Sequence, residues 1–186
     1  MRIIGGINKG KKIKIPIDNS TRPLRDLVKE SIFNLITHSN KFDVSIINSN
    51  ILDLFSGIGS FGLECHSRGA KFITFVENYK KALNVLKKNV TNLNAENFTK
   101  IEEIDCFHYF SKQILTSKLY DIIFLDPPYK ESKINLLIDK ILEIQLLKDN
   151  GILIIHRHKN DKVKITSNLN ILISRDYGIS KIIMGN

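Results

Sequence analysis

The sequence predicts an α/β protein in which a doubly wound, mostly parallel sheet is covered by helices on both faces. Three observations carry this prediction. From residue 45 onward, short apolar runs alternate with helix-like stretches. The run YDIIFLD at 120–126 is apolar enough for a parallel strand that is buried on both faces. Residues 169–185 change pattern and are expected to form an antiparallel hairpin that turns near Tyr177 and Gly178.

The alternating part gives a definite order of elements. Strands are expected at 50–55, 71–77, 99–105, 120–126 and 151–157. Helices are expected at 59–69, 79–93, 106–115 and 133–146. The helix at 79–93 has a clear apolar face, formed by Ala82, Leu83, Leu86 and Val90.

The first 45 residues differ and are expected to form a basic N-terminal extension, packed on a main domain of residues 46–186. Apolar and basic residues alternate around glycines in 2–16, which predicts a small hairpin. A helix should follow, because Pro23 suits a helix N-terminus and Leu27, Ile32, Leu35 and Ile36 recur at helical spacing.

Composition excludes several classes of protein. A chain of 186 residues suits one domain with a sizeable core. No apolar run reaches the roughly 20 residues that span a bilayer, so we expect a cytoplasmic protein without a membrane anchor. Cys65 and Cys106 form no C-x-x-C pair and are expected to be buried thiols. His156 and His158 have no third ligand nearby, so no metal site is expected.

The net charge of +9 is unevenly distributed along the chain. Residues 1–50 hold nine lysines and arginines against four acidic residues. This asymmetry favours contact with a polyanion such as nucleic acid, although a solvated basic surface is the alternative interpretation.

A glycine-rich loop follows the first predicted strand. Gly57, Gly59 and Gly62 have the spacing G-x-G-x-x-G between a strand and a helix, which is typical of a nucleotide-type cofactor site. Glu77 ends the next strand, where its carboxylate could accept ribose hydroxyls. NAD and S-adenosylmethionine are both candidates, and a turn without a ligand is a third interpretation. Asp53 favours S-adenosylmethionine, because a carboxylate repels a pyrophosphate but pairs with an ammonium.

The third strand ends at Asp105, which is therefore expected at the carboxyl edge of the sheet, where open α/β folds bind ligands. Its carboxylate could accept the adenine amino group, with Cys106 or Phe107 beside the ring. The same carboxylate could cap the helix that follows. The two roles are compatible.

The fourth strand ends in Asp126, Pro127, Pro128 and Tyr129. The prolines remove two N–H donors and hold their predecessors in extended conformations, so that backbone carbonyls can face a pocket. Such acceptors suit an NH₂ group, and Tyr129 offers a face on which a planar base or amide can stack. Acceptors aimed at a weakly nucleophilic NH₂ also stabilise the positive charge that develops when the nitrogen is methylated. The loop and this tetrapeptide together indicate an amino methyltransferase.

The chain resembles the class I S-adenosylmethionine-dependent methyltransferases, and more closely the bacterial 16S ribosomal RNA methyltransferase D family, which methylates a guanine 2-amino group. The resemblance covers nearly the whole chain and is carried by MRIIGG, KGKKIKIP, TRP with VKESIFN, LDLFSGIGSFGLE, SRGA, FVE, FLDPPY and YGISK. It implies a Rossmann-like, seven-stranded sheet. The chain departs from the family at Leu24, Leu27 and Arg157-His158, and no role is assigned to Arg157.

The resemblance also implies the site residues. Asp126 to Tyr129 would hold the guanine, and the cofactor S-adenosylmethionine would be bound by Asp53, Phe55, Gly57, Gly59, Glu77, Asn78, Asp105, Cys106 and Phe107. RNA would be contacted by Lys9, Lys11, Lys12, Arg22, Arg25 and Lys29, although Arg22 could instead close over the cofactor. The expected partner is 16S rRNA or a small-subunit assembly particle, bound by a monomer. Three alternatives stay open: an amino methyltransferase acting on DNA adenine or protein glutamine, a NAD-dependent oxidoreductase, and a non-catalytic RNA-binding module.

Overall fold

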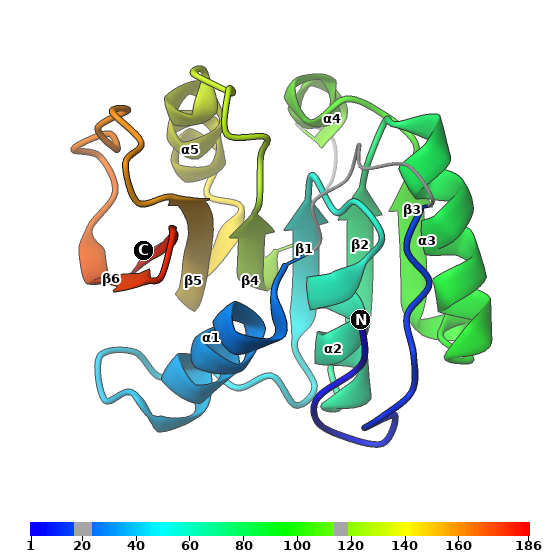
Figure 1. Cartoon of the computed structure of the whole chain (residues 1–186). Coiled ribbons are helices and arrows are strands. Elements are labelled where there is room, and N and C mark those ends of the chain that lie inside the picture. The colour runs from blue at the N-terminus through cyan, green and yellow to red at the C-terminus, as the bar shows by residue number, and fades with distance from the viewer. Residues whose placement is uncertain (17–23, 114–118) are drawn as a thin grey trace.

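A computed structural model describes residues 1–16, 24–113 and 119–186, and contains a seven-stranded sheet in the order β3-β2-β1-β4-β5-β7-β6 (Figure 1). The strands are β1 (Asn50–Leu54), β2 (Phe72–Val76), β3 (Thr99–Glu102), β4 (Tyr120–Leu125), β5 (Leu147–His158), β6 (Ile171–Tyr177) and β7 (Ser180–Gly185). The pairs among β1 to β5 are parallel, whereas β7 runs antiparallel to both β5 and β6. The predicted fold class is confirmed.

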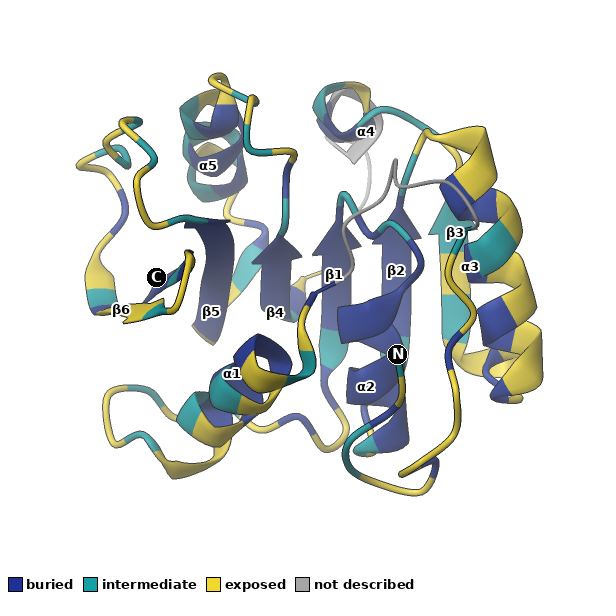
Figure 2. Ribbon diagram, in the orientation of Figure 1, coloured by how far each residue is buried: buried dark blue, intermediate teal, exposed yellow. Residues whose placement is uncertain are grey.

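Helices cover both faces of the sheet (Figures 1 and 2). They are α1 (Asp26–His38), α2 (Ser60–Ser67), α3 (Lys80–Asn92), α4 (Cys106–Gln113) and α5 (Ile134–Glu143), with a 3₁₀ turn at Glu96–Phe98. Side chains of α1, α2 and α3 share one hydrophobic cluster with the strands, and those of α4 and α5 share the other. The inner strands β1, β2 and β4 are buried on both faces because alternate side chains enter opposite clusters. Among the described residues, no helix has the length and apolar character needed to cross a membrane.

The N-terminal segment pairs with itself over a single antiparallel bridge, Arg2 to Lys12, rather than as a hairpin of two strands. It is also tied to the helices beneath it. The backbone N–H of Ile4 donates to the Glu64 carboxylate at 2.8 Å, and that of Asn8 donates to Ser67 Oγ at 2.9 Å. Buried Ile3 and Ile13 belong to the same cluster as α1, α2 and α3, so this segment shares the core of the sheet.

Lys29 corrects one prediction. Its side chain is completely buried, and Nζ donates to the Arg2 carbonyl at 2.7 Å while lying 3.5 Å from Glu64 Oε2 and 3.8 Å from Asp26 Oδ1. Glu64 is equally buried and also accepts a hydrogen bond from Arg68 Nε at 2.9 Å. Burial lowers the pKa of Lys29, and the two nearby carboxylates oppose that shift. The expected contact between Lys29 and RNA is therefore wrong.

Element boundaries differ from the predicted ones at a few places. Strand β5 begins at Leu147 instead of residue 151, because Leu147 pairs with Tyr120 before an irregularity in the ladder. Helix α1 begins at Asp26, and the predicted helix start at Pro23 lies outside the described residues. The 3₁₀ turn was not predicted, since three residues are too few to show a periodicity.

Candidate active site

The loop between β1 and α2 turns through left-handed backbone conformations. Phe55, Gly57 and Gly59 have φ angles of 55°, 56° and 82°, which glycine adopts freely and other residues adopt only rarely. A Cβ atom on Gly59 would lie 2.5 Å from Leu86 Cδ1. Gly59 therefore permits the close approach of α2 to α3 and does not itself line the cavity described next.

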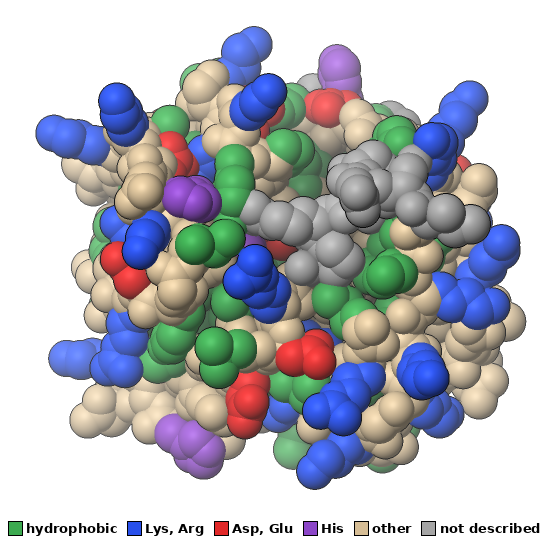
Figure 3. All heavy atoms as spheres, in the orientation of Figure 1, with side chains coloured by type: hydrophobic (Ala, Val, Ile, Leu, Met, Phe, Trp, Pro, Cys, Tyr) green, Lys and Arg blue, Asp and Glu red, His purple; other side chains and the backbone are tan. Residues whose placement is uncertain are grey.

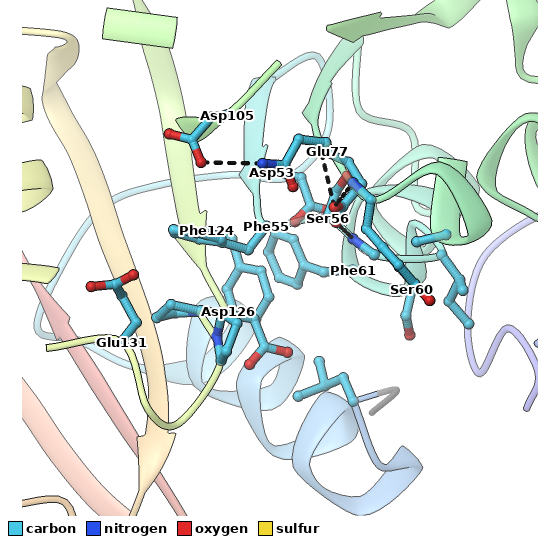
Figure 4. A pocket seen from close by; sticks show the side chains of 18 of the residues that line it. Asp53, Phe55, Ser56, Ser60, Phe61, Glu77, Asp105, Phe124, Asp126 and Glu131 are labelled. Atoms are coloured by element: carbon cyan, nitrogen blue, oxygen red, sulfur yellow. Dashed lines mark hydrogen bonds between the residues drawn. The ribbon is translucent and has the colours of Figure 1, made fainter. Parts of the chain in front are cut away.

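A cavity of about 530 Å³ opens beside this loop, at the carboxyl ends of β1, β2 and β4 (Figure 4). Its size lies within the range of roughly 300–1,000 Å³ that is usual for small-molecule sites. It brings together most of the residues predicted for the cofactor and the target: Asp53, Phe55, Gly57, Glu77, Asn78, Asp105, Phe107, Asp126, Pro127, Pro128 and Tyr129.

The cavity is strongly acidic. Five carboxylates line it, from Asp53, Glu77, Asp105, Asp126 and Glu131, and within the described part of the chain no lysine or arginine does. A pyrophosphate would be repelled here, which disfavours the NAD interpretation. S-adenosylmethionine carries a sulfonium and an ammonium, so its charge fits this lining.

Among the five carboxylates that line the cavity, that of Asp53 is the most buried. Its side chain is 1% exposed, and Oδ2 accepts a hydrogen bond from the Gly62 N–H at 3.0 Å. Burial raises the pKa of Asp53 well above its usual value, and the charges of Asp126 and Glu77 raise it further, although the Gly62 hydrogen bond opposes the shift. A bound cation would therefore stabilise the ionised form of Asp53, which burial disfavours.

Glu77 organises the backbone around the cavity. Its carboxylate accepts N–H hydrogen bonds from Gly57 at 2.7 Å, Asn78 at 2.9 Å and Tyr79 at 2.8 Å. A carboxylate offers about four lone-pair positions, so one remains for a ligand hydroxyl without loss of these bonds. Glu77 would thus hold the glycine loop and contact a ribose at the same time.

Asp105 performs the predicted capping role. Its Oδ1 accepts the Phe107 N–H at 2.8 Å, and its Oδ2 accepts a hydrogen bond from Asn78 Nδ2 at 3.2 Å (Figure 4). The expectation for the Cys106 side chain is wrong. Its Sγ is buried, accepts the Phe55 N–H at 3.3 Å and does not line the cavity, whereas Phe107 does.

The loop after β4 is fixed by a residue to which the sequence assigned no role. Arg157 is 2% exposed and donates to the carbonyls of Pro128 at 3.3 Å, Tyr129 at 3.4 Å and Glu131 at 2.9 Å. Its Nε also donates to the Asp161 carboxylate. The prolines cannot donate hydrogen bonds, so this guanidinium supplements the loop N–H of Glu131, which donates to the Pro128 carbonyl at 2.8 Å.

Sequence reasoning missed the floor of the cavity. The rings of Phe61 and Phe124 stack with centroids 4.1 Å apart, and both line the cavity. Phe124 is the residue of β4 two places before Asp126 and points to the helix α2 face. Ser56, Ile58 and Ser60 also line the cavity, and their position within the glycine loop was the signal that could have identified them.

The predicted RNA contacts divide into three groups. Lys9, Lys11, Lys12 and Arg25 are exposed, Lys29 is buried, and Arg22 lies outside the described residues. Arg25 follows Leu24, which lines the cavity. Lysine and arginine side chains gather on the part of the surface where Figure 1 places the N-terminal segment (Figure 3).

Comparison with known proteins identifies the family. The model of the family described as conserved hypothetical protein 95 matches residues 1–186. The chain is 33% identical over 166 residues to ribosomal RNA small subunit methyltransferase D of Buchnera aphidicola, which covers 89% of this chain and 82% of that protein. The chain therefore belongs to the family of the ribosomal RNA small subunit methyltransferase D proteins. It is also 37% identical over 154 residues to a Bacillus subtilis protein named "Putative rRNA methyltransferase YlbH", with 83% and 80% of the two chains covered.

A solved structure agrees with this assignment. A Haemophilus influenzae protein named as a "putative methylase" superposes with a TM-score of 0.77 at 28% identity, over 99% of this chain and 96% of that chain. The predicted enzyme class is confirmed: this methyltransferase D family member is an S-adenosylmethionine-dependent methyltransferase. The oxidoreductase and the non-catalytic module are set aside.

Proposed function

We propose that this methyltransferase D family member methylates the exocyclic 2-amino group of a guanine in 16S rRNA. The observation that carries the proposal is the position of Asp126, Pro127, Pro128 and Tyr129 on the wall of the acidic cavity. Such a segment suits a flat group that bears an NH₂. The names of the curated relatives support ribosomal RNA as the molecule that carries it.

Bound S-adenosylmethionine supplies an activated methyl group. The protein supplies orientation and charge stabilisation. An amino nitrogen that gains a methyl group becomes positively charged and must lose a proton, and the proposal assigns the Asp126 carboxylate as the acceptor that faces it. Its negative charge favours the charged nitrogen in a cavity where water is restricted. Stacking on Tyr129 would fix the plane of the base and supply part of the orientation effect.

The target base must leave its stack to enter this cavity. Phe61 and Phe124 line the cavity together with Asp126 and Tyr129, so a base must be inserted among these side chains to reach the tetrapeptide. We therefore propose that the substrate presents the guanine in a loop or flips it out of a helix.

The basic N-terminal segment would hold the RNA during this step. Lys9, Lys11 and Lys12 are exposed beside α2, and Arg25 is exposed next to the cavity. These positions favour an RNA path across the face that carries α1 and α2. Phosphate contacts of this kind are weakened by salt.

The substrate can be tested with purified enzyme and a labelled methyl donor. Small ribosomal subunits, free 16S rRNA, duplex DNA and a release factor are offered separately. Label is expected in guanine of the ribosomal RNA, and comparison of the first two substrates distinguishes free RNA from an assembled particle. Label found only in DNA or protein would overturn the proposal.

The role of the tetrapeptide needs a matched pair of variants. Asp126→Asn should abolish most methyl transfer and leave cofactor binding in place. Asp121→Asn is the control, because Asp121 lies at the opposite end of β4, where it pairs with Lys148 on the surface. Equal loss of activity in both variants would contradict the proposed role of Asp126.

The RNA surface is tested by its salt dependence. Replacing Lys9, Lys11 and Lys12 with alanine should weaken RNA binding and reduce the slope of log affinity against log salt by about three. A triple variant with the same charge change, at Lys100, Lys140 and Lys148, is the control, since these lysines lie on the edge strand β3, on α5 and at the start of β5. An unchanged slope in the first variant would exclude this surface.

We further propose that the protein acts as a monomer in the cytoplasm. The substrate class supports this location, because ribosomal subunits assemble there in bacteria. Sedimentation of the free protein and of its complex with RNA would test the oligomeric state. A dimer at the concentration used for activity assays would contradict the monomer.

A further inference from the structure

Three side chains form a hydrogen-bonded chain behind the target-binding segment. Asp126 Oδ1 lies 2.7 Å from Nδ1 of His156, and Nε2 of His156 lies 2.8 Å from Oγ of Ser180. These residues come from the end of β4, from β5 and from β7. The side chains of His156 and Ser180 are buried, whereas Asp126 reaches the cavity.

The chemistry of the partners restricts where the hydrogen atoms lie. An ionised Asp126 only accepts hydrogen bonds, so Nδ1 of His156 must donate to it. A neutral ring then accepts at Nε2, and the Ser180 hydroxyl donates to it. Both ring nitrogens of His156 and the hydroxyl hydrogen of Ser180 have partners in this arrangement, as buried polar groups require.

We propose that His156 is a positioning residue, which Ser180 orients and which in turn holds the Asp126 carboxylate in place for the amino group of the substrate. The role given to Asp126 rests on the function proposed above. His156 uses one of the lone-pair positions on Oδ1, so the other positions of the carboxylate, including both on Oδ2, can face the substrate. The carboxylate is thereby fixed by one bond and prevented from rotating away from the cavity.

The surroundings of His156 fit this role. Its ring lies edge-on to that of Tyr129, with centroids 6.3 Å apart. His156 thus contacts the carboxylate at the start of the tetrapeptide and approaches the ring at its end. Strand β5 is paired with β4 on one side and β7 on the other, so the imidazole is carried by the interior of the sheet.

The position of the hydrogen can be measured without any RNA substrate. In protein labelled with ¹⁵N at histidine, the ring resonances should show that Nδ1 of His156 carries a hydrogen. Asp126→Asn should shift those resonances, because it changes the acceptor. A His156 ring whose Nδ1 lacks a hydrogen would overturn the proposal, whatever the substrate of the enzyme is.

The kinetic test compares two replacements of the same residue. His156→Ala removes the donor and should lower kcat roughly 10- to 100-fold, as expected for a misplaced reacting group, with the cofactor KM unchanged. His156→Asn places an amide N–H near the former Nδ1 and should restore most of kcat. Ser180→Ala removes one hydrogen bond behind the ring and should lower kcat about fivefold.

A second buried histidine supplies the control. His66 lies on α2, packs against Phe98 and does not line the cavity. His66→Ala should lower the melting temperature and leave kcat unchanged. Folded His156→Ala with the kcat of the wild type would overturn the proposal, and so would His156→Asn with a kcat as low as that of His156→Ala. A wild-type enzyme that methylates none of the RNA substrates refutes the proposed function instead, and the nitrogen resonances then decide the inference.

Discussion

Replacing Lys29 with methionine should destabilise the protein strongly, because it removes the cation from a buried ion network. Removing one partner of a buried pair costs about 3–5 kcal/mol. Glu64 would keep its bonds to Arg68 and to the Ile4 N–H, so we expect the lower end of that range. For a domain of this size, 1 kcal/mol shifts the melting temperature by about 2–4 °C, so a loss of about 3 kcal/mol lowers it by about 6–12 °C.

Thermal unfolding of a double-mutant cycle tests the reasoning. Lys29→Met and Glu64→Gln each leave a buried group short of a partner, so the double variant should lose about 1–3 kcal/mol less than the sum of the two. Lys12→Met is the control: Lys12 is an exposed lysine of the N-terminal segment, and its loss should change the free energy of unfolding by less than about 0.5 kcal/mol. The proposed ion network would be refuted if the losses in the free energy of unfolding were additive. It would also be refuted if Lys29→Met lowered the melting temperature no more than the control does.

The pH dependence gives an independent check on the same residue. Burial lowers the pKa of Lys29 below its usual 10.5, so the folded state loses that proton at a lower pH than the unfolded chain. Between the two pKa values the unfolded state binds more protons, and stability therefore rises with pH in that window. In Lys29→Met, the free energy of unfolding should not show this rise with pH, which urea unfolding at several pH values would test.

Three further predictions concern the cavity and the residues that support it. Asp53→Asn should weaken cofactor binding, which calorimetry would show. It should also stabilise the free protein by about 0.5–2 kcal/mol in unfolding experiments above the raised pKa of Asp53, because the folded state then no longer buries an ionised carboxylate. The gain should shrink as the pH falls and vanish below the usual pKa of 3.8, where the folded and the unfolded chain both hold the proton. Gly62→Ala places a Cβ 2.4 Å from Phe75 Cε1, so overpacking should cost about 1–3 kcal/mol in urea unfolding, and an unchanged midpoint would contradict the packing role. Arg157→Lys keeps the charge but lacks the fork that reaches three carbonyls, so methyl transfer should fall roughly 10- to 100-fold while cofactor affinity is maintained.

Local sequence patterns were sufficient for most of the fold. Apolar runs such as 120–126 and the helical spacing in 79–93 report whether a segment is buried on one face or two, and this decides its secondary structure. The same logic could have corrected the error at Lys29. Residue 29 is three and four positions from Ile32 and Phe33, on the apolar face of α1, so its burial was visible in the spacing.

Other parts of the site depend on contacts between distant segments. The glycine loop, Glu77 and Asp105 could be predicted because the carboxyl ends of parallel strands meet at one edge of the sheet. The pairing of His156 with Asp126 and Ser180 joins residues separated by 30 and 24 positions, and the sequence carries no local pattern for it. Only the register of β5 against β4 and β7 brings these side chains together.

That register also explains how a segment with two prolines can serve as a rigid binding wall. Pro127 and Pro128 donate no backbone hydrogen bonds, so the segment cannot be held by regular backbone pairing. Adjacent residues of a strand point to opposite sides, and β5 uses both. His156 contacts the carboxylate of Asp126 at the start of the segment, while Arg157 donates to the carbonyls of Pro128, Tyr129 and Glu131 toward its end. Two neighbouring side chains of an interior strand thus hold this loop at both ends.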